Sequence, residues 1–318
     1  MNPGSVTISS EWVVAQRPPR GAKLDPLKPH AFFLEEECDA NGGIRKSATI
    51  LLTNKECPWC CLMCDLWKNT LTETVPPGAI PGQIRFALAQ LGGCPPQIKL
   101  YNSGSFFDPA AIPLPDYSAV AQAVSTAQNV VVESHPRLVG EKAVRLRDML
   151  NGKLEVAIGL ETIHPGVLPR LNKRFSLDQF SAATRFLRGN GIAVRAFILV
   201  KPPFLDEAEA LEWAKRSAEF AFQNGASVVS LIPTRGGNGA MEQLRQAGEF
   251  APPKLSTLES AQEHVLGLRL GRVFADTWDL QQFSNCSACF ESRRARLHAM
   301  NLFQKLLPRT PCPVCARK

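Results

Sequence analysis

The most informative feature of the sequence is a group of four cysteines within eight residues, Cys57-Pro58-Trp59-Cys60-Cys61-Leu62-Met63-Cys64. Cys57, Cys61 and Cys64 form a CxxxCxxC pattern. Three thiolates can hold three corners of a [4Fe–4S] cube and leave the fourth iron without a protein ligand, whereas a fourth cysteine would close the site. An open iron binds a substrate or a cofactor directly. The pattern therefore predicts a reactive iron–sulfur centre.

Other interpretations of this cysteine group stay open at the level of the sequence. Cys60 allows the alternative register Cys57, Cys60 and Cys64. All four thiols would also suit a zinc ion, or could be reactive groups in their own right. Since no N-terminal stretch has the basic start and apolar run of a secretory signal, we expect a cytoplasmic, reducing compartment. Closely spaced cysteines bind metals there more often than they form disulfides.

A second cysteine group lies near the C-terminus. Cys286-x2-Cys289 and Cys312-x2-Cys315 are two CxxC pairs with 22 residues between them, slightly more than the usual spacing in structural zinc sites. Four thiolates in two such pairs favour a closed tetrahedral Zn²⁺ site. A second [4Fe–4S] cluster and free thiols are the alternatives.

The formal net charge of +7 is concentrated in the same C-terminal stretch. From Cys286 to Lys318 the chain has seven basic residues and one acidic residue, Glu291. Phosphate contacts supply much of the affinity for nucleic acids, so this basic tail favours RNA as a partner. A tail that only improves solubility is the alternative. No apolar run approaches the roughly 18 to 20 residues that span a membrane, so we expect no membrane partner.

The elements that must position the first cysteine group can be read from the hydrophobic pattern. From Ser47 onward, short apolar runs alternate with helical patterns, as in repeated βα units around a parallel sheet. The capping box Ser176 to Gln179 starts one of these helices, which should end near Gly189 and Gly191. The runs of strand length are residues 48–53, 97–102, 129–133, 154–160, 193–200 and 227–232.

Six such units fit an α/β fold with a partial (β/α)6 TIM-type barrel, and a doubly wound sheet is the alternative. We divide the chain into a proline-rich N-terminal arm (residues 1–45), the barrel (46–270) and a small basic C-terminal module with the two CxxC pairs (271–318). In both architectures the functional loops follow the strands. The cysteine group follows the first predicted strand, where a site is expected.

On these features the sequence resembles the radical SAM superfamily. A CxxxCxxC group after the first strand is that superfamily's defining motif, and Ser103, Gly104 and Ser105 after the second strand are similar to its glycine-containing segment. The resemblance implies that the open iron binds S-adenosylmethionine (SAM). One electron from the cluster then breaks the sulfonium bond and gives methionine and a 5′-deoxyadenosyl radical. An external donor such as ferredoxin or flavodoxin would supply the electron.

Polar residues at later strand ends resemble one branch, which contains elongator-type and MiaB-type enzymes and oxygen-independent coproporphyrinogen oxidase. Glu133 ends the third strand, Glu161 follows the fourth, and Arg174 stands 13 residues further on. In that branch the matching residues hold the ribose and the carboxylate of SAM, and the segment from Ser103 to Ser105 contacts its amino group. Met63 stands where the family usually has an aromatic residue, and we assign it to the same cofactor site.

Two segments, residues 197–210 and 248–253, resemble the radical SAM subunit of archaeosine synthase, which acts on a lysine-substituted 7-deazaguanine base in tRNA. The resemblance implies a tRNA-modifying enzyme with a partner subunit, and places Lys201 in the substrate pocket as a catalytic residue. A lysine that merely extends to solvent is the alternative. Residues 233–237 depart from that subfamily. A small metabolite or a peptide therefore stays open as the substrate, as does a non-enzymatic, metal-dependent nucleic-acid binder or redox sensor.

Overall fold

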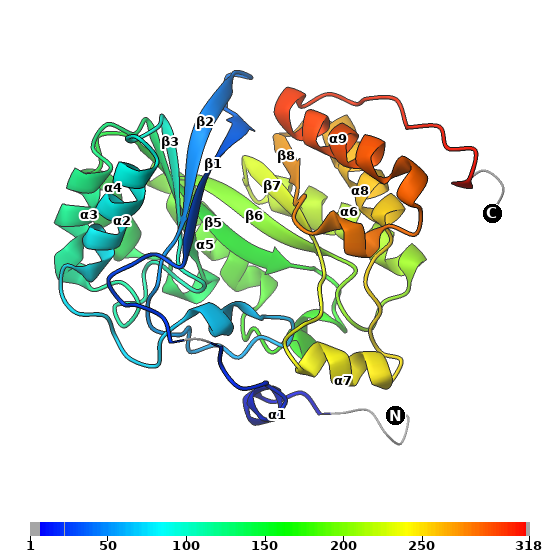
Figure 1. Cartoon of the computed structure of the whole chain (residues 1–318), viewed down its shortest axis with the longest axis horizontal. Coiled ribbons are helices and arrows are strands. Elements are labelled where there is room, and N and C mark those ends of the chain that lie inside the picture. Colours follow the sequence, from blue (N-terminus) through cyan, green and yellow to red (C-terminus); the bar gives the residue numbers. More distant parts are fainter. Residues whose placement is uncertain (1–6, 22, 316–318) are drawn as a thin grey trace.

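A single curled sheet of eight strands forms the centre of the computed structural model, which describes residues 7–21 and 23–315. The strands lie side by side in chain order, and β1 pairs with β2 in antiparallel fashion while each later pair is parallel. Figure 1 shows the sheet as a half-barrel, which confirms the predicted α/β partial barrel. The strands are β1 (Ala31–Cys38), β2 (Ile44–Leu51), β3 (Gln97–Tyr101), β4 (Asn129–Ser134), β5 (Lys153–Glu161), β6 (Ala193–Val200), β7 (Val228–Pro233) and β8 (Arg272–Ala275).

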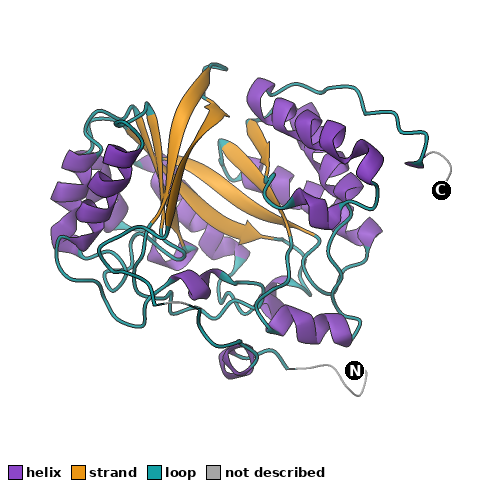
Figure 2. Ribbon diagram, in the orientation of Figure 1, coloured by secondary structure: helices purple, strands orange, loops and turns teal. Residues whose placement is uncertain are grey.

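Helices cover the outer face of this sheet (Figure 2). α2, α3 and α4 pack on one another along one flank, and α6 packs on α8 along the other. The α-helices are α1 (Ser10–Ala15), α2 (Ala79–Gln90), α3 (Tyr117–Ala123), α4 (Glu141–Met149), α5 (Leu177–Gly189), α6 (Glu207–Gln223), α7 (Ala240–Gln246), α8 (Leu255–Leu268) and α9 (Ser287–Phe303). Short 3₁₀ helices are η1 (Leu66–Asn69), η2 (Leu114–Asp116), η3 (Pro136–Leu138), η4 (Leu168–Leu171) and η5 (Leu280–Phe283).

The predicted capping box at the start of α5 is present. The hydroxyl of Ser176 accepts from the backbone N–H of Gln179 at 3.2 Å, and the side-chain oxygen of Gln179 accepts from the N–H of Ser176 at 3.0 Å. The helix ends at Gly189, and Gly191 follows with a φ of 71°. This φ favours glycine, which has no Cβ to oppose it.

The six predicted strands correspond to β2 through β7, and two further strands escaped prediction. β1 lies within residues 1–45 and β8 within residues 271–318, so the sheet extends into both segments that flank the predicted barrel. Three consecutive acidic residues, 35–37, interrupt the apolar pattern of β1, and β8 has only four residues. Neither strand gives the run of alternating or apolar residues from which strands are recognised.

A buried network of charges fills the interior of the half-barrel near the amino ends of the parallel strands. Arg195 donates to Glu155 at 2.7 Å and to Glu37 at 2.6 Å, and Lys99 also pairs with Glu37. Burial alone would raise the pKa of Glu37, but the charges of Arg195 and Lys99 outweigh it and hold this pKa well below its usual range. β1 thus supplies a carboxylate that two buried cations require.

The first and last strands of the sheet meet. Arg272 of β8 donates to the backbone carbonyl of Cys38 in β1 at 2.9 Å and to Glu155 at 3.0 Å. The rings of Phe33 and Trp278 lie 5.0 Å apart, and α9 packs against both strands. The Arg272 contacts join the two edges of the half-barrel at the end opposite the cysteine loop, and the contact between Phe33 and Trp278 lies nearer the carboxyl ends of the parallel strands.

Candidate functional site

The first cysteine group lies on the loop between β2 and η1, at the carboxyl ends of the parallel strands. Cys57, Cys61 and Cys64 are partly buried, and the N–H of Cys64 donates to the carbonyl of Cys61 at 3.2 Å, which makes a tight turn. Burial raises the pKa of the Cys57 thiol to about 11 and that of Cys64 to about 12. Burial therefore favours the neutral thiols, and binding of a metal requires that they lose their protons.

The structure distinguishes Cys60 from Cys61. The ionisable neighbours of the Cys61 thiol are Lys173, Cys64, Cys57 and Glu161. Cys60, in contrast, packs into an apolar cluster. Cys57 and Cys64 are thus neighbours of the Cys61 thiol, while the side chain of Cys60 packs against the apolar cluster.

The loop after β3 lies directly against Cys57. A Cβ added to Gly104 would come within 3.0 Å of the Cβ of Cys57, so only glycine allows this approach. Ser103 adopts a φ of 56°, and the hydroxyl of Ser105 lies 2.9 Å from that of Ser134. The predicted segment from Ser103 to Ser105 therefore borders the cysteine loop.

Glu133 at the end of β4 holds this loop in place. Its carboxylate accepts from the N–H of Asn102 at 2.6 Å and from that of Gly104 at 3.3 Å. Burial raises the pKa of Glu133 despite these two hydrogen bonds, which favour the ionised form. The side chain of Asn102 is fully buried, and its amide nitrogen and oxygen find no partner among the described residues. Buried amides are almost always hydrogen-bonded, so this one fits a bound group at the site.

Glu161 and Lys173 form a buried ion pair beside the cysteines. Glu161 ends β5 with a φ of 65°, a strained conformation for a residue other than glycine. Gly159 leaves the space for this pair, because an added Cβ would collide with the ammonium group of Lys173. Burial would lower the pKa of Lys173, but Glu161 and Cys61 outweigh it and raise this pKa. A permanent positive charge therefore lies next to the candidate cluster ligands.

The other predicted site residues lie around this centre. Arg174 is exposed, and its guanidinium donates to the hydroxyl of Ser10 at 2.7 Å. Lys201 ends β6 with a φ of 58°, and its ammonium group donates to Glu207 at 2.9 Å. Met63 packs between two apolar clusters and forms part of the wall.

Three residues that sequence reasoning missed lie at the centre of the site. They are Asn102, Lys173 and His135. The Nε2 atom of His135 lies 2.8 Å from the carbonyl oxygen of Lys173, and its ring centre lies 4.6 Å from that of Trp59. Desolvation lowers the pKa of His135 to about 3, so its ring is neutral. Lys173 directly precedes the predicted Arg174, but no signal in the sequence indicates which of the two side chains points inward.

For the SAM binding that the sequence resemblance implies, Lys173 should matter more than Arg174. We expect Lys173→Gln to weaken SAM binding by about tenfold or more, the size of one lost charge-assisted hydrogen bond. Arg174→Gln should have a smaller effect because its guanidinium is exposed. Equilibrium dialysis with reconstituted protein measures both. An equal loss in the two variants would contradict the inward position of Lys173.

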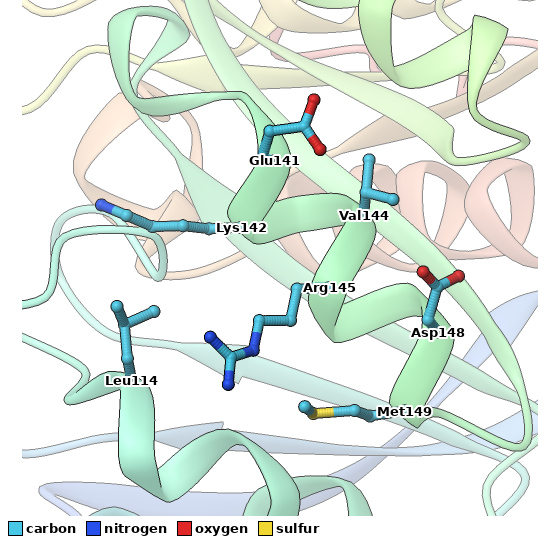
Figure 3. Close-up of a pocket in the computed structure, with 7 residues that line it drawn as sticks. All are labelled: Leu114, Glu141, Lys142, Val144, Arg145, Asp148 and Met149. Atoms are coloured by element: carbon cyan, nitrogen blue, oxygen red, sulfur yellow. The ribbon is translucent and has the colours of Figure 1, made fainter.

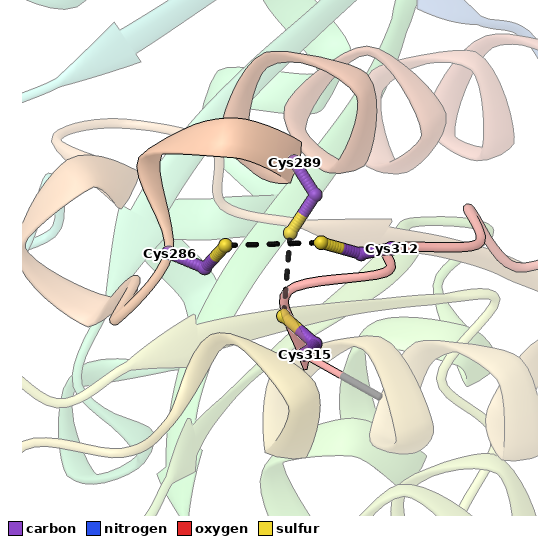
Figure 4. Close-up of side chains that lie close together, drawn as sticks. All are labelled: Cys286, Cys289, Cys312 and Cys315. Carbon is purple, nitrogen blue, oxygen red and sulfur yellow. Dashed lines mark hydrogen bonds between the residues drawn. The ribbon is translucent and has the colours of Figure 1, made fainter. Parts of the chain in front are cut away.

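The four C-terminal cysteines form a compact group (Figure 4). The sulfurs of Cys286 and Cys312 lie 3.8 Å apart, those of Cys289 and Cys315 lie 3.7 Å apart, and all four lie within 4.8 Å of one another. A tetrahedral ion with metal–sulfur bonds of about 2.3 Å requires sulfurs about 3.8 Å apart. Backbone N–H groups, chiefly that of Cys289, lower the pKa of Cys286 to about 7. The group can bind a metal ion.

Three of the arginines that make the C-terminal region basic are already paired. Arg293 binds Glu259, while Arg296 and Arg309 both bind Glu263 on α8. These ion pairs fasten α9 and the following segment to α8, so much of the predicted RNA-binding charge is neutralised within the protein. The basic residues at positions 317 and 318 lie outside the described residues.

A surface pocket of about 470 Å³ lies over α4 (Figure 3). Glu141, Lys142 and Arg145 are among the residues that line it, and none of the predicted site residues does. The pocket is separate from the candidate site. Within the described part of the chain, no helix has both the length and the hydropathy of a membrane span.

Comparison with known proteins gives sequence relatives from archaea, and no protein-family model matches the chain. An uncharacterized protein of Methanocaldococcus jannaschii is 26% identical over 73% of this chain and 67% of its own length. Archaeosine synthase subunit beta of Methanosarcina acetivorans is 26% identical over 68% of this chain, and that of Thermococcus kodakarensis is 31% identical over 56%. The matches span 65% and 57% of the lengths of these two subunits.

Solved structures with the same fold are radical SAM proteins. Methylornithine synthase has a TM-score of 0.52 and 16% identity over 70% of this chain and 63% of its own. Elp3 of Methanocaldococcus infernus has a TM-score of 0.51 and 16% identity over 69% of this chain and 59% of its own. These matches confirm the resemblance that the cysteine motif predicts. In its fold this chain resembles radical SAM enzymes, and in its sequence it is similar to archaeosine synthase subunit beta.

Proposed function

We propose that this protein is a radical SAM enzyme and that it modifies a base in tRNA, of the 7-deazaguanine kind on which archaeosine synthase acts. The sequence similarity to two archaeosine synthase beta subunits is the observation that carries the proposal. The matches cover only 65% and 57% of the lengths of those subunits. We therefore propose the tRNA substrate and a partner subunit for this chain by analogy with them. A ferredoxin or a flavodoxin would donate the electron, and the cytoplasm is the compartment in which such a donor acts.

In this proposal Cys57, Cys61 and Cys64 hold a [4Fe–4S] cluster. When bound, the cluster and SAM would supply radical chemistry for removing a hydrogen atom from the substrate. Lys173 keeps a positive charge beside the thiolates, which favours their deprotonated state. Asn102 offers its unpartnered amide to the bound group. Glu133 acts through the backbone of the Asn102 loop, which it fixes.

Four further residues complete the proposed site. Glu161 and Arg174 would contact SAM, with the loop of residues 103–105 beside its amino group. Met63 would form an apolar wall. Lys201 would lie in the substrate pocket, where its pairing with Glu207 holds the ammonium group at the end of β6.

Binding and turnover with tRNA test the substrate. A tRNA with the modified base should bind with an affinity that falls steeply as salt rises, and should increase 5′-deoxyadenosine formation. A filter-binding titration at two salt concentrations and an anaerobic turnover assay measure these effects. No binding at low salt would contradict the proposal and favour a small metabolite or a peptide as the substrate.

For the C-terminal cysteines we propose zinc. The four sulfurs lie at the spacing of ligands on one tetrahedral ion. In a [4Fe–4S] cluster each cysteine binds a different iron and points away from the cube, so the sulfurs would be farther apart. A single Zn²⁺ ion does not change its oxidation state, so the site would be structural and would fasten residues 312–315 to the start of α9.

Metal analysis distinguishes these alternatives. We expect about four irons and one zinc per chain after anaerobic reconstitution. Changing Cys312 and Cys315 together to serine should remove the zinc and leave the iron, because the two groups are separate. About eight irons without zinc in the unchanged chain would contradict the proposal and indicate a second cluster.

A further inference from the structure

A segment near the N-terminus crosses the loop that carries the candidate cluster ligands. We call residues 9–20 the N-terminal strap. It consists of α1, capped by Ser9 whose hydroxyl accepts from the N–H of Trp12 at 3.1 Å, and of the extended chain that follows. Figure 1 shows α1 beside α7, below the carboxyl ends of the parallel strands.

Arg20 of the strap joins the two ends of the cysteine loop. Its guanidinium pairs with Glu56, which directly precedes Cys57. It also donates to the backbone carbonyls of Trp67 and Thr70, both at 2.6 Å, which follow Cys64 in the chain. A planar guanidinium with several donors can hold such acceptors at once, whereas a lysine ammonium on its flexible stem cannot reproduce this geometry.

Arg17 adds a second contact at the same place. It donates to the other oxygen of Glu56 at 2.6 Å. The guanidinium groups of Arg17 and Arg20 lie 4.7 and 5.6 Å from the ring centre of Trp67, which is only 4% exposed. Two cations therefore share one carboxylate and one aromatic ring at the base of the loop.

The strap also contacts the middle of the loop. Val13 and Leu62 are buried in one apolar cluster with Met241 and Leu244 of α7. Leu62 lies between Cys61 and Cys64, and its N–H donates to the carbonyl of Leu171 at 2.9 Å. α1 thus packs directly against the segment that carries two of the candidate ligands, Cys61 and Cys64.

Gly239 at the start of α7 fixes the path of the strap. The backbone carbonyl of Gln16 lies so close to Gly239 that an added Cβ would collide with it. Gly239 has a φ of 90°, whereas Gly248, with a φ of 74°, has nothing within 4 Å of an added Cβ. The two glycines have similar backbone requirements, but only Gly239 leaves room for the strap.

We propose that the N-terminal strap is part of the cluster site and that Arg20 and Arg17 are positioning residues that hold the cysteine loop in its ligating shape. This inference rests on the proposed function in one respect, namely that the loop binds a [4Fe–4S] cluster. The ligands lie on a loop of irregular backbone, so their spacing depends on what fixes the two ends of the loop. Substitution of a residue that orients metal ligands typically lowers metal affinity by about 10- to 100-fold.

The rate of iron release tests the inference. We expect Arg20→Ala to release iron to a chelator about tenfold faster than the unchanged chain under anaerobic conditions, and to alter the electron paramagnetic resonance spectrum of the reduced cluster. Glu56→Gln should act in the same direction because it removes the shared partner of both arginines. Arg20→Lys should fall between Arg20→Ala and the unchanged chain. Arg45→Ala, which breaks an exposed ion pair with Asp39, is the control and should release iron at the normal rate.

A matched pair of glycine variants tests the strap without changing a charge. Gly239→Ala should accelerate iron release because its methyl group displaces Gln16, whereas Gly248→Ala should not. If Arg20→Ala does not fold, Glu56→Gln and Gly239→Ala carry the test. Normal release rates and spectra in these variants would overturn the inference while the cluster assignment stands. Failure of the unchanged chain to hold a cluster would instead overturn the proposed function.

Discussion

Replacing Cys61 with alanine should abolish dithionite-dependent formation of 5′-deoxyadenosine, whereas replacing Cys60 should preserve most of it. The thiol of Cys61 lies with Cys57, Cys64 and Lys173, while the side chain of Cys60 packs into the apolar cluster behind the loop. Removing one of three ligands leaves the cluster without a stable attachment. Removing an apolar contact costs only packing energy.

The two adjacent cysteines are each other's control. Both variants should fold, as circular dichroism will show, and differ in iron content after anaerobic reconstitution. The unchanged chain and Cys60→Ala should each carry about four irons at this site. The reverse result, with activity retained in Cys61→Ala and lost in Cys60→Ala, would establish the alternative register.

Replacing Arg195 with methionine should destabilise the fold by about 3 to 5 kcal/mol, the usual cost of removing one partner from a buried ion pair. Glu37 and Glu155 would both lose a hydrogen-bonded cation in the barrel interior. Urea unfolding measures the loss. Arg216→Met removes an ion pair with Glu212 on the surface of α6, and should cost a small fraction of that amount.

The loss should depend on pH in a defined direction. The folded-state pKa of Glu37 is well below its usual range, so its contribution to stability is fully present above the unfolded-state pKa of about 4.3. That contribution disappears as the pH falls below this value toward the folded-state pKa. The difference between Arg195→Met and the unchanged chain should therefore be largest near pH 7 and smaller near about pH 3.5. A difference independent of pH would contradict the assigned role of Glu37.

The sequence predicted the parts of the fold that depend on local patterns. β2 through β7 are apolar runs whose side chains face the core, and α5 carries its own start signal in Ser176 and Gln179. β1 is different because its acidic residues face cations that lie far away in the chain, Lys99 and Arg195. No local pattern predicts a pairing of that kind.

The same limit applies to the proposed site. The spacing of Cys57, Cys61 and Cys64 identified the loop, but the choice between Cys60 and Cys61 depends on which side chain meets the apolar cluster. Likewise, Lys173 points inward and Arg174 outward in a turn whose backbone has positive φ at residues 172 and 174. In such a turn the sequence does not show which side chain points inward. The conformation of the turn depends on how it packs against the rest of the protein.

The contact between β1 and β8 has a consequence for how the chain matures during synthesis. Arg272 provides both the hydrogen bond to Cys38 and a second cation for Glu155, so residues separated by more than 230 positions must meet before these contacts form. Contacts of such long range form late in folding. During synthesis the cysteine loop emerges from the ribosome before β8 does. Until β8 has emerged, the edge of the sheet at β1 lacks its contacts with β8. Stable insertion of iron into the proposed cluster site is therefore expected to follow emergence of β8.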